Sequence, residues 1–352
     1  MGTPRASDHD RTATHGRFTR RALLAGAGAG LASLAGCLSH GDDSGLSGEI
    51  VIDGSNTLFP NTAIVAERFW WQNNQVDVSA RKSGTGAGFQ QFGRGETDLQ
   101  NASRAIAADE RELLEANGVE WIELEVVLDG LAIMKHPNND WCHCLTPEAL
   151  QALWERASTV ETWRDLAERT DAVETSNAVA ADDPDLEATD VDDWPDERIS
   201  LYGRDTASGT FDYFTETING AVGNIRNDYS GTPDTNAIVR GVSGNEDAIG
   251  FGGAGYYEEN RDELDLVAVH NGEDCVYPEP ETIEAGTYTP LSRPMFLYVR
   301  VDALEREAVR AFVEFYLDHT QETAREAGFY AVPDETIEEQ RTKLDERRGG
   351  HQ

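Results

Sequence analysis

Three segments of this chain share one design, in which a short apolar strand leads into a turn of small residues and then into a helix. The turns span residues 54–60, 83–89 and 203–211. Strands that alternate with helices favour an α/β fold. In open α/β sheets ligands lie beyond the carboxyl ends of the strands, and each of these turns follows such an end. The pattern therefore constrains both the fold and the place of a binding site.

The rest of the chain fits the same fold class. Apolar runs predict strands over residues 49–52, 76–80, 126–134, 199–202, 248–251, 266–269 and 295–299. Helical spacing predicts helices over residues 63–71, 89–92, 211–218 and 303–319, with Asp302 as N-cap of the last, and a further helix that starts at Thr146-Pro147. Trp70 and Trp71 fall on the first of these helices, where core packing is the expected role. Residues 171–193 hold nine acidic residues, no basic residue and no periodicity, which predicts a solvated insertion loop.

The three turns carry groups that bind anions. A helix start offers N–H donors without intrahelical partners and the positive end of the helix dipole. Glycine lets the backbone approach a ligand closely, and serine and threonine add hydroxyl donors. A single turn of this kind commonly does no more than cap its helix. Three of them, one carrying Arg204, indicate a site for a small oxyanion.

A fourth segment, residues 95–106, strengthens this prediction. Asp98 and Leu99 are expected to form a short strand, which leaves Ser103 and Arg104 beyond its carboxyl end. Arg104 and Arg204 would each present a forked set of donors that suits a tetrahedral oxyanion. The alternative for Arg104 is an ion pair with one of the many surface carboxylates.

In this order the four segments resemble the phosphate-binding proteins of phosphate ABC transporters. The matching motifs are Gly-Ser-Asn-Thr-Leu-Phe-Pro at 54–60, Ser-Gly-Thr-Gly at 83–86, Gly-Glu-Thr-Asp followed by Asn-Ala-Ser-Arg within 95–104, and Gly-Arg-Asp-x-x-Ser-Gly-Thr at 203–210. The likeness spans about residues 48 to 340. It implies a type II periplasmic-binding-protein fold, with the anion in the cleft between two α/β lobes. The expected lobes are residues 49–132 with 294–345, and residues 133–293, joined by crossings near 130–135 and 292–296.

Carried onto this chain, the resemblance implies a phosphate-binding shell drawn from all four segments. Its members would be Ser55, Asn56, Thr57, Leu58, Ser83, Thr85, Gly86, Ser103, Arg104, Arg204, Ser208, Gly209 and Thr210. Many members of the family have an aspartate at the position of Arg104, which accepts a hydrogen bond from protonated phosphate and helps to reject sulfate. Asp98 and Asp205 are the nearest candidate acceptors in sequence. The resemblance also implies the permease and ATPase of an ABC importer as partners, a monomer, no cofactor and no catalysis.

The first 37 residues are typical of an export signal. Arg20 and Arg21 form a twin-arginine pair, and the apolar run at 22–36 is shorter than the ~20 residues of a membrane span. Leu-Ala-Gly before Cys37 resembles a lipoprotein signal, in which Cys37 becomes the lipidated first residue. The alternative is a plain anchor helix. Residues 38–48 resemble a flexible tether, so we expect a lipid-anchored protein on the extracellular face of the cytoplasmic membrane.

The charge of the chain indicates adaptation to high salt. Its 352 residues include 65 acidic and 29 basic ones, a net charge of −36, and only three of the basic residues are lysines. Self-repulsion at this density opposes folding in dilute buffer, whereas molar salt shortens the Debye length to about 3 Å. We interpret the acidic runs as the solvated surface of a haloarchaeal type of protein rather than as calcium sites. The same charge disfavours nucleic acid as a partner.

The cysteines beyond residue 37 favour a disulfide over a metal site. Cys142 and Cys144 flank His143, but no second ligand cluster completes a tetrahedral site, so we expect no metal. Disulfides form outside the cell. We therefore expect Cys275 to pair with Cys142 or with Cys144.

Two other functions compete with phosphate capture. One is binding of another tetrahedral oxyanion, such as sulfate, molybdate or tungstate. The other is an enzyme, for instance a secreted phosphatase. The chain contains no P-loop, no Gly-x-Ser-x-Gly elbow and no His-Glu-x-x-His motif, which disfavours the enzyme.

Overall fold

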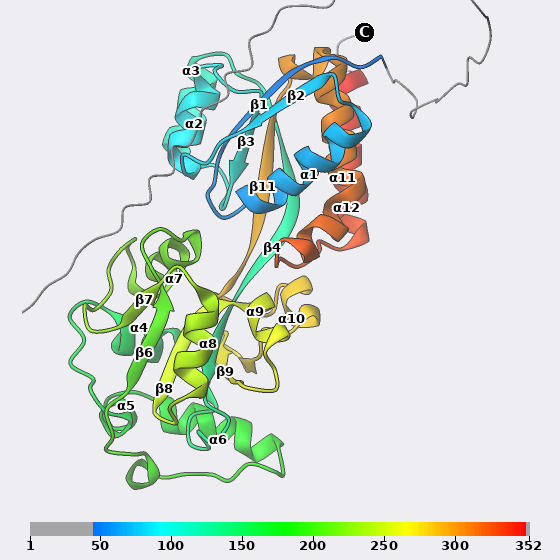
Figure 1. Ribbon diagram of the computed structural model, residues 1–352. Coiled ribbons are helices and arrows are strands. Elements are labelled where there is room, and N and C mark those ends of the chain that lie inside the picture. Colours follow the sequence, from blue (N-terminus) through cyan, green and yellow to red (C-terminus); the bar gives the residue numbers. More distant parts are fainter. Residues whose placement is uncertain (1–44, 350–352) are drawn as a thin grey trace, which may run out of the picture. The chain divides into compact units, whose positions relative to one another are not determined.

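The structure, a computed structural model, describes residues 45–349, which form two α/β lobes that share two long strands (Figure 1). These strands are β4 (Trp121–Lys135) and β11 (Ser292–Arg300), which pair antiparallel along the whole of β11. The twin-arginine pair and Cys37 lie outside the described residues. Among the described residues, no helix is long and apolar enough to cross a membrane.

The first lobe is built on a sheet with the strand order β2–β1–β3–β11–β4. Its first three strands are parallel, so their carboxyl ends lie at one edge: β1 (Gly48–Gly54), β2 (Val76–Ala80) and β3 (Leu99–Ala102). One face is covered by α1 (Phe59–Gln72), α11 (Glu307–Glu326) and α12 (Asp334–Gly349) (Figure 1). The other face is covered by α2 (Thr85–Gly93) and α3 (Ala108–Ala116).

Apolar residues on both faces of this sheet hold the helices in place. Ile50 and Ile52 of β1 pack with Phe69 of α1 in one core. On the opposite face Phe89 of α2 packs edge-to-face on Tyr298 of β11, with ring centres 4.9 Å apart. Complete burial of each such side chain stabilises the fold by about 1.5–3 kcal/mol. The helix starts are thereby fixed at the carboxyl edge of the strands.

The second lobe continues the sheet in the order β4–β8–β6–β7, with β9 also paired to β4. Its strands are β5 (Cys144–Leu145), β6 (Ser200–Arg204), β7 (Ser230–Thr232), β8 (Ala248–Gly253), β9 (Asp265–His270) and β10 (Cys275–Val276). Its helices are α4 (Pro147–Trp154), α5 (Trp163–Arg169), α6 (Ala172–Asp182), α7 (Gly209–Asn219), α8 (Thr235–Ser243), α9 (Ala254–Glu259) and α10 (Pro280–Glu284). Strands β6, β7 and β8 are parallel, so β6 and β7 end at the same edge.

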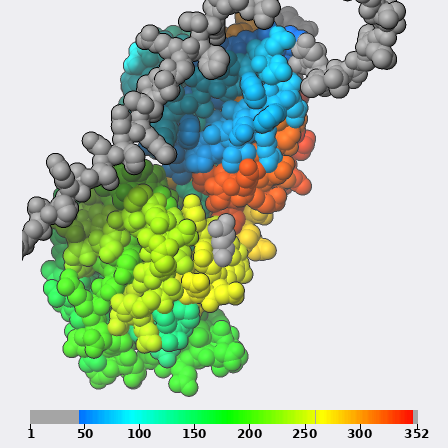
Figure 2. Space-filling view, viewed as in Figure 1, coloured from blue at the N-terminus to red at the C-terminus, as the bar shows by residue number. Residues whose placement is uncertain are grey.

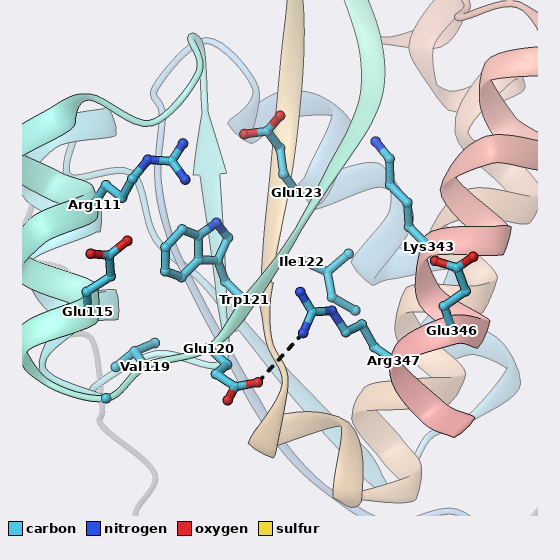
Figure 3. A pocket seen from close by; sticks show the side chains of 11 residues that line it. Arg111, Glu115, Val119, Glu120, Trp121, Ile122, Glu123, Lys343, Glu346 and Arg347 are labelled. Atoms are coloured by element: carbon cyan, nitrogen blue, oxygen red, sulfur yellow. Dashed lines mark ion pairs between the residues drawn. The ribbon is translucent and has the colours of Figure 1, made fainter. Parts of the chain in front are cut away.

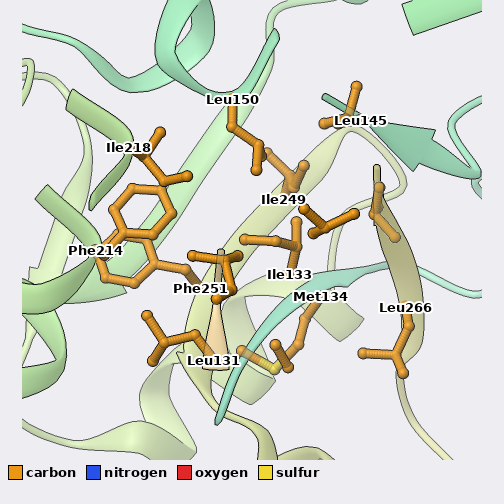
Figure 4. Close-up of a cluster of buried hydrophobic side chains, with 14 of the residues drawn as sticks. Leu131, Ile133, Met134, Leu145, Leu150, Phe214, Ile218, Ile249, Phe251 and Leu266 are labelled. Carbon is orange, nitrogen blue, oxygen red and sulfur yellow. The ribbon is translucent and has the colours of Figure 1, made fainter. Parts of the chain in front are cut away.

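The core of the second lobe gathers side chains from β4, β8, β9 and the surrounding helices (Figure 4). Phe214 of α7 stacks on Phe251 of β8, with ring centres 4.0 Å apart. Leu131 and Ile133 of β4 and Ile249 of β8 fill the space beside them. Helix α7 is therefore held firmly enough to position its first turn.

The change from one core to the other falls within β4. Val127 packs in the first core and Leu128 in the second, so residues 128–132 pack with the second lobe although we expected them in the first. Tyr330 also packs in the second core and forms a β-bridge with Leu128. Because β4 runs on without a break, no turn residue marks this boundary in the sequence.

A polar contact ties the two shared strands to the second lobe. Arg293 of β11 donates to Asp129 of β4 at 3.2 Å, and both side chains are largely buried. The Arg293 guanidinium also lies 3.7 Å from the ring centre of Tyr213 on α7. Helix α7 therefore contacts the strands at the point where they pass between the lobes.

The expected solvated loop at residues 171–193 is wrong, because the segment contains α6 and the short 3-10 helix η1 (Val191–Asp193). Ser176 of α6 accepts hydrogen bonds from the backbone N–H groups of His143 and Cys144 at 3.1 and 3.3 Å. Ala172 and Ala180 are buried. Small and polar side chains hold this helix, so its sequence lacks the apolar periodicity that predicts helices.

Two other expectations about helices are also wrong. A 3-10 turn, η2 (Asp302–Glu305), precedes α11, so Arg306 rather than Asp302 occupies the N-cap position. Trp70 and Trp71 are 46% and 71% exposed instead of packing in the core. The core-facing residues of α1 are Val65 and Phe69, and the two tryptophans follow on the other side of the helix.

A disulfide joins Cys144 of β5 to Cys275 of β10, with their Cα atoms 6.1 Å apart. Both short strands pair with β9, so the bond fastens one edge of the second lobe. Cys142 is a buried free thiol, and burial raises its pKa to about 12. Of the two pairings left open by the sequence, the structure contains the one with Cys144.

Candidate anion-binding site

The turn after β1 is tied to β3 through its backbone. The N–H of Ser55 donates to the carbonyl oxygen of Asn101 at 2.8 Å. A Cβ on Gly54 would lie 2.1 Å from the same oxygen, and Gly54 has a φ of 129°, so only glycine fits there. The buried Ser55 hydroxyl accepts hydrogen bonds from the N–H groups of Thr57 and Leu58. Ser55 therefore shapes the turn from within.

The other three predicted residues of this turn, Asn56, Thr57 and Leu58, differ in how far their side chains are buried. Asn56 is exposed, whereas the Leu58 side chain is fully buried in the first-lobe core. The Thr57 side chain is half-buried and lies against the second lobe. Thr57 is thus the side chain of this turn that faces both lobes.

The turn after β2 meets the end of β3. Thr85 Oγ1 lies 3.0 Å from Ser103 Oγ and accepts the Ser103 N–H at 3.2 Å. A Cβ on Gly86 would lie 3.7 Å from Glu110 Oε1 and 4.0 Å from Arg104 Nη2. The structure therefore brings the second and fourth predicted segments together.

A buried carboxylate that sequence analysis missed lies beneath these turns. Asp53 of β1 is 2% exposed and accepts the N–H of Gly54 at 2.7 Å and that of Ser83 at 2.9 Å. Burial raises the pKa of Asp53, but these hydrogen bonds outweigh it and hold the pKa below the ordinary value of 3.8. Ionised Asp53 therefore links the two turns. The sequence could have indicated Asp53, because an acidic residue there follows directly on the apolar residues of a predicted strand.

Arg104 forms a two-pronged ion pair with Glu110 of α3, with both N–O distances 2.8 Å. Glu110 is 4% exposed. Its hydrogen-bonded carboxylate raises the pKa of Arg104, and the charge of Glu216 on α7 adds to this effect. Arg104 is thus in an ion pair, although its partner is a buried carboxylate and not one of the surface carboxylates that the alternative named.

Arg204 ends β6 and donates a hydrogen bond through Nη1 to the hydroxyl of Thr235 at the start of α8. Its Nε is buried and has no hydrogen-bond partner among residues 45–349. A buried charged donor without an acceptor is costly, which makes Arg204 Nε a candidate ligand contact. Sequence analysis missed Thr235, although Thr-Pro-Asp-Thr at 232–235 carries a turn and an N-cap.

The turn between β6 and α7 is built by its own side chains. Ser208 is the N-cap of α7 and accepts the N–H of Thr210 at 3.2 Å. Asp205 Oδ1 accepts the N–H of Ala207 at 3.2 Å. Asp205 therefore stabilises the loop between β6 and α7. The N-terminal end of α7, with its N–H groups and the positive end of its dipole, faces the first lobe.

The turn after β1 in the first lobe contacts the start of α7 in the second lobe, where the carboxyl ends of the strands of both lobes meet. Gly209 packs against Thr57 so closely that a Cβ at position 209 would lie 1.6 Å from Thr57 Oγ1. Thr57 follows β1, and Gly209 opens α7. The first and third predicted segments therefore meet, as the second and fourth do.

Asp98 is not at this edge, so its candidate role as a ligand acceptor is wrong. Its carboxylate accepts the N–H of Val51 at 2.9 Å and forms an ion pair with Arg306. Asp98 precedes β3, whereas Ser103 follows it, and a strand of four residues spans about 13 Å. Nearness in sequence placed Asp98 at the wrong end of the strand.

A separate hollow of about 820 Å³ lies between α3, β4 and α12 in the first lobe (Figure 3). Charges of both signs line it, and Arg347 pairs with Glu120 at 3.8 Å. The Arg111 guanidinium lies 5.6 Å from the ring centre of Trp121. None of the predicted site residues lines this hollow, and its charges largely compensate one another.

Two α/β lobes that share a pair of antiparallel strands, with helix starts from both lobes in contact, define a solute-binding protein of the type II periplasmic-binding-protein fold. Residues 40–320 match the PBP superfamily domain. The chain is 36% identical over 292 residues to Protein SphX of Synechocystis sp., covering 82% of this chain and 80% of the relative. It is 34% identical over 307 residues to phosphate-binding protein PstS of Staphylococcus saprophyticus, covering 86% and 87%.

A solved structure agrees with these relatives. The crystal structure of a possible phosphate binding protein from Planctomyces limnophilus superposes with a TM-score of 0.74 at 36% identity, covering 86% of this chain and 99% of the other. The chain therefore belongs to the PBP superfamily and, within it, to the family of phosphate-binding proteins.

Proposed function

We propose that this chain captures inorganic phosphate between its lobes and delivers it to the permease and ATPase complex of an ABC importer, without catalysis. The buried Nε of Arg204, a charged donor with no partner in the described part of the chain, carries this proposal. A tetrahedral oxyanion at the end of β6 would supply the acceptor. The names of the relatives, phosphate-binding protein among them, support phosphate as that oxyanion.

The proposed ligand shell draws on the two pairs of touching segments. Thr85 and Ser103 offer hydroxyl groups 3.0 Å apart in the first lobe. Thr57 and the start of α7 contribute from the place where the lobes touch. The other proposed members are Ser55, Asn56, Leu58, Ser83, Gly86, Arg104, Ser208, Gly209 and Thr210. Helix starts and hydroxyl groups let a protein with a net charge of −36 hold an anion.

Calorimetric titration of the full chain in molar potassium chloride tests this function. We expect one equivalent of phosphate to bind more tightly than sulfate, molybdate or tungstate. No heat with phosphate, together with tight binding of tungstate or sulfate, would reject phosphate and retain the site.

We further propose that the protein leaves the cell by twin-arginine export and stays as a monomer on the outer face of the membrane, anchored by a lipid on Cys37. The twin-arginine pair, the short apolar run and Leu-Ala-Gly-Cys support this. Cys37→Ser should release the protein into the medium, whereas a twin lysine replacement of Arg20 and Arg21 should stop export. Membrane retention unaltered by Cys37→Ser would argue for a plain anchor helix instead.

A further inference from the structure

The exposed tryptophans at the end of α1 have no part in the binding site. Trp70 and Trp71 lie edge-to-face with ring centres 5.5 Å apart, and the other five tryptophans are buried or half-buried. The segment 69–76, Phe-Trp-Trp-Gln-Asn-Asn-Gln-Val, contains no charged residue in a chain that is 27% charged. Helix α1 therefore ends in an uncharged aromatic tip on an otherwise acidic protein.

This aromatic tip, Trp70 with Trp71, lies where the chain enters the first lobe. Helix α1 runs back along β1, so its end lies beside the start of that strand, and the surface of α1 and β2 is open on the face seen in Figure 2. The N–H of Gly48 donates to the carbonyl oxygen of Gln75 at 3.4 Å. Cys37 precedes Gly48 by eleven residues, a stretch that reaches at most about 40 Å. A lipid on Cys37 would therefore keep a bilayer within reach of the tip.

We propose that Trp70 and Trp71 insert into the headgroup region of the bilayer that holds the lipid anchor, and so orient the first lobe on the membrane. Tryptophan favours this depth because its ring is apolar and its N–H is polar. A lipid on Cys37 fixes only the end of a tether, so a second contact on the folded part is what would set the orientation of the lobe. In molar salt, repulsion between acidic protein and anionic lipid extends only about 3 Å. The inference rests on the proposed anchoring at Cys37.

The area of the aromatic tip favours a bilayer over a second copy of the chain. A stable protein interface buries about 800 Å² on each partner. Two tryptophans bury at most ~500 Å² even when fully covered. Insertion into lipid needs no complementary surface, so a tip of this size is sufficient.

Quenching of tryptophan emission by lipid tests the inference. The full chain is bound to phosphatidylcholine vesicles that are brominated near the top of the acyl chains, in molar potassium chloride. We expect quenching and a blue shift in the wild type, and loss of both in Trp70→Ser/Trp71→Ser. The matched control is Tyr256→Ser, which removes a 41% exposed aromatic residue from α9 of the second lobe and should leave the quenching intact. Phosphate affinity should be the same in all three proteins.

The results of this experiment distinguish the proposed tryptophan contact from the proposed lipid anchor. An anchored wild-type protein without quenching overturns the tryptophan contact and leaves the anchor standing. Quenching that persists in Cys37→Ser protein, which cannot carry the lipid, supports the contact and shows that it forms without the anchor. Self-association without vesicles that the double replacement abolishes would also overturn it, since the tip would then serve a second copy.

Discussion

A Cβ on Gly209 would lie 1.6 Å from Oγ1 and 2.9 Å from Cβ of Thr57. The start of α7 in the second lobe thus rests directly on the turn after β1 in the first lobe. No side chain fits between them, so the contact of the lobes at this point depends on glycine.

Replacing Gly209 by alanine should hold the lobes apart and weaken phosphate binding about tenfold, or ~1.4 kcal/mol. Titration measures the affinity, and small-angle scattering should give a larger radius of gyration with phosphate present. The control is Gly253→Ala, because a Cβ there meets Tyr256 at an ordinary 3.4 Å. Wild-type affinity in the Gly209 variant would show that the contact is not needed for binding.

Arg204→Ala should weaken phosphate binding by about 2–5 kcal/mol, because it removes a buried charged donor from the proposed site. Thr235→Val, which removes the hydroxyl partner of Arg204, should cost about 0.5–1.5 kcal/mol. Arg240→Ala, whose side chain is 67% exposed on the same α8, should change nothing. Equal titration curves for Arg204→Ala and the wild type would refute the pocket.

Arg104→Ala should lower the free energy of unfolding by about 1–3 kcal/mol, since it leaves the buried carboxylate of Glu110 without its ion pair. Adding Glu110→Gln should restore most of this stability, as thermal unfolding will measure. If Arg104 also contacts phosphate, affinity stays low in the double variant. Recovery of affinity together with stability would instead make Arg104 a purely structural residue.

The pKa of Asp53 is below 3.8 in the folded protein, so folding favours its ionised form. Its contribution to the free energy of unfolding is therefore complete above pH 3.8 and is lost as the pH falls through the folded pKa. Asp53→Asn should lower the melting temperature at neutral pH and flatten its decline in acid. Parallel pH curves for variant and wild type would contradict this role.

Dilution of salt should destabilise the protein because of its net charge of −36. Lowering potassium chloride from about 1 M to about 0.1 M lengthens the Debye length from roughly 3 to roughly 10 Å and strengthens self-repulsion. Calorimetry should show a lower melting temperature at the lower salt concentration. An unchanged melting temperature would remove the case for salt adaptation.

Sequence reasoning succeeded where neighbouring residues decide the structure. The strand expected at 76–80 is β2 residue for residue, and Thr146 caps α4 by accepting the N–H of Ala149. The small-residue segments likewise lead into α1, α2 and α7, although each contains the first residues of its helix. These features depend on apolar alternation, capping and glycine, all of which are local.

It failed where distant parts of the chain decide. Helix α6 depends on the hydrogen bonds that Ser176 accepts from the N–H groups of His143 and Cys144. Asp53 depends on the N–H of Ser83, thirty residues away. Thr235 can accept the hydrogen bond of Arg204 only because β7 pairs with β6 and so places the start of α8 beside Arg204. Trp71 is exposed because the packing of α1 on α11 selects a different face of the helix. No local pattern contains this information.

The joint between the lobes is itself a hydrogen-bonded ladder, because β4 and β11 pair across it. Paired strands have a preferred twist, so rotation of one lobe against the other works against an elastic restoring force. A joint made of loops would have no rest angle. Arg293, which contacts Asp129 and the ring of Tyr213, lies beside this ladder. These contacts add to the resistance against rotation on the side of α7. If the lobes open to admit the proposed phosphate, they would therefore twist about a defined rest position, and the affinity would depend on the stiffness of two strands that need not touch the ligand.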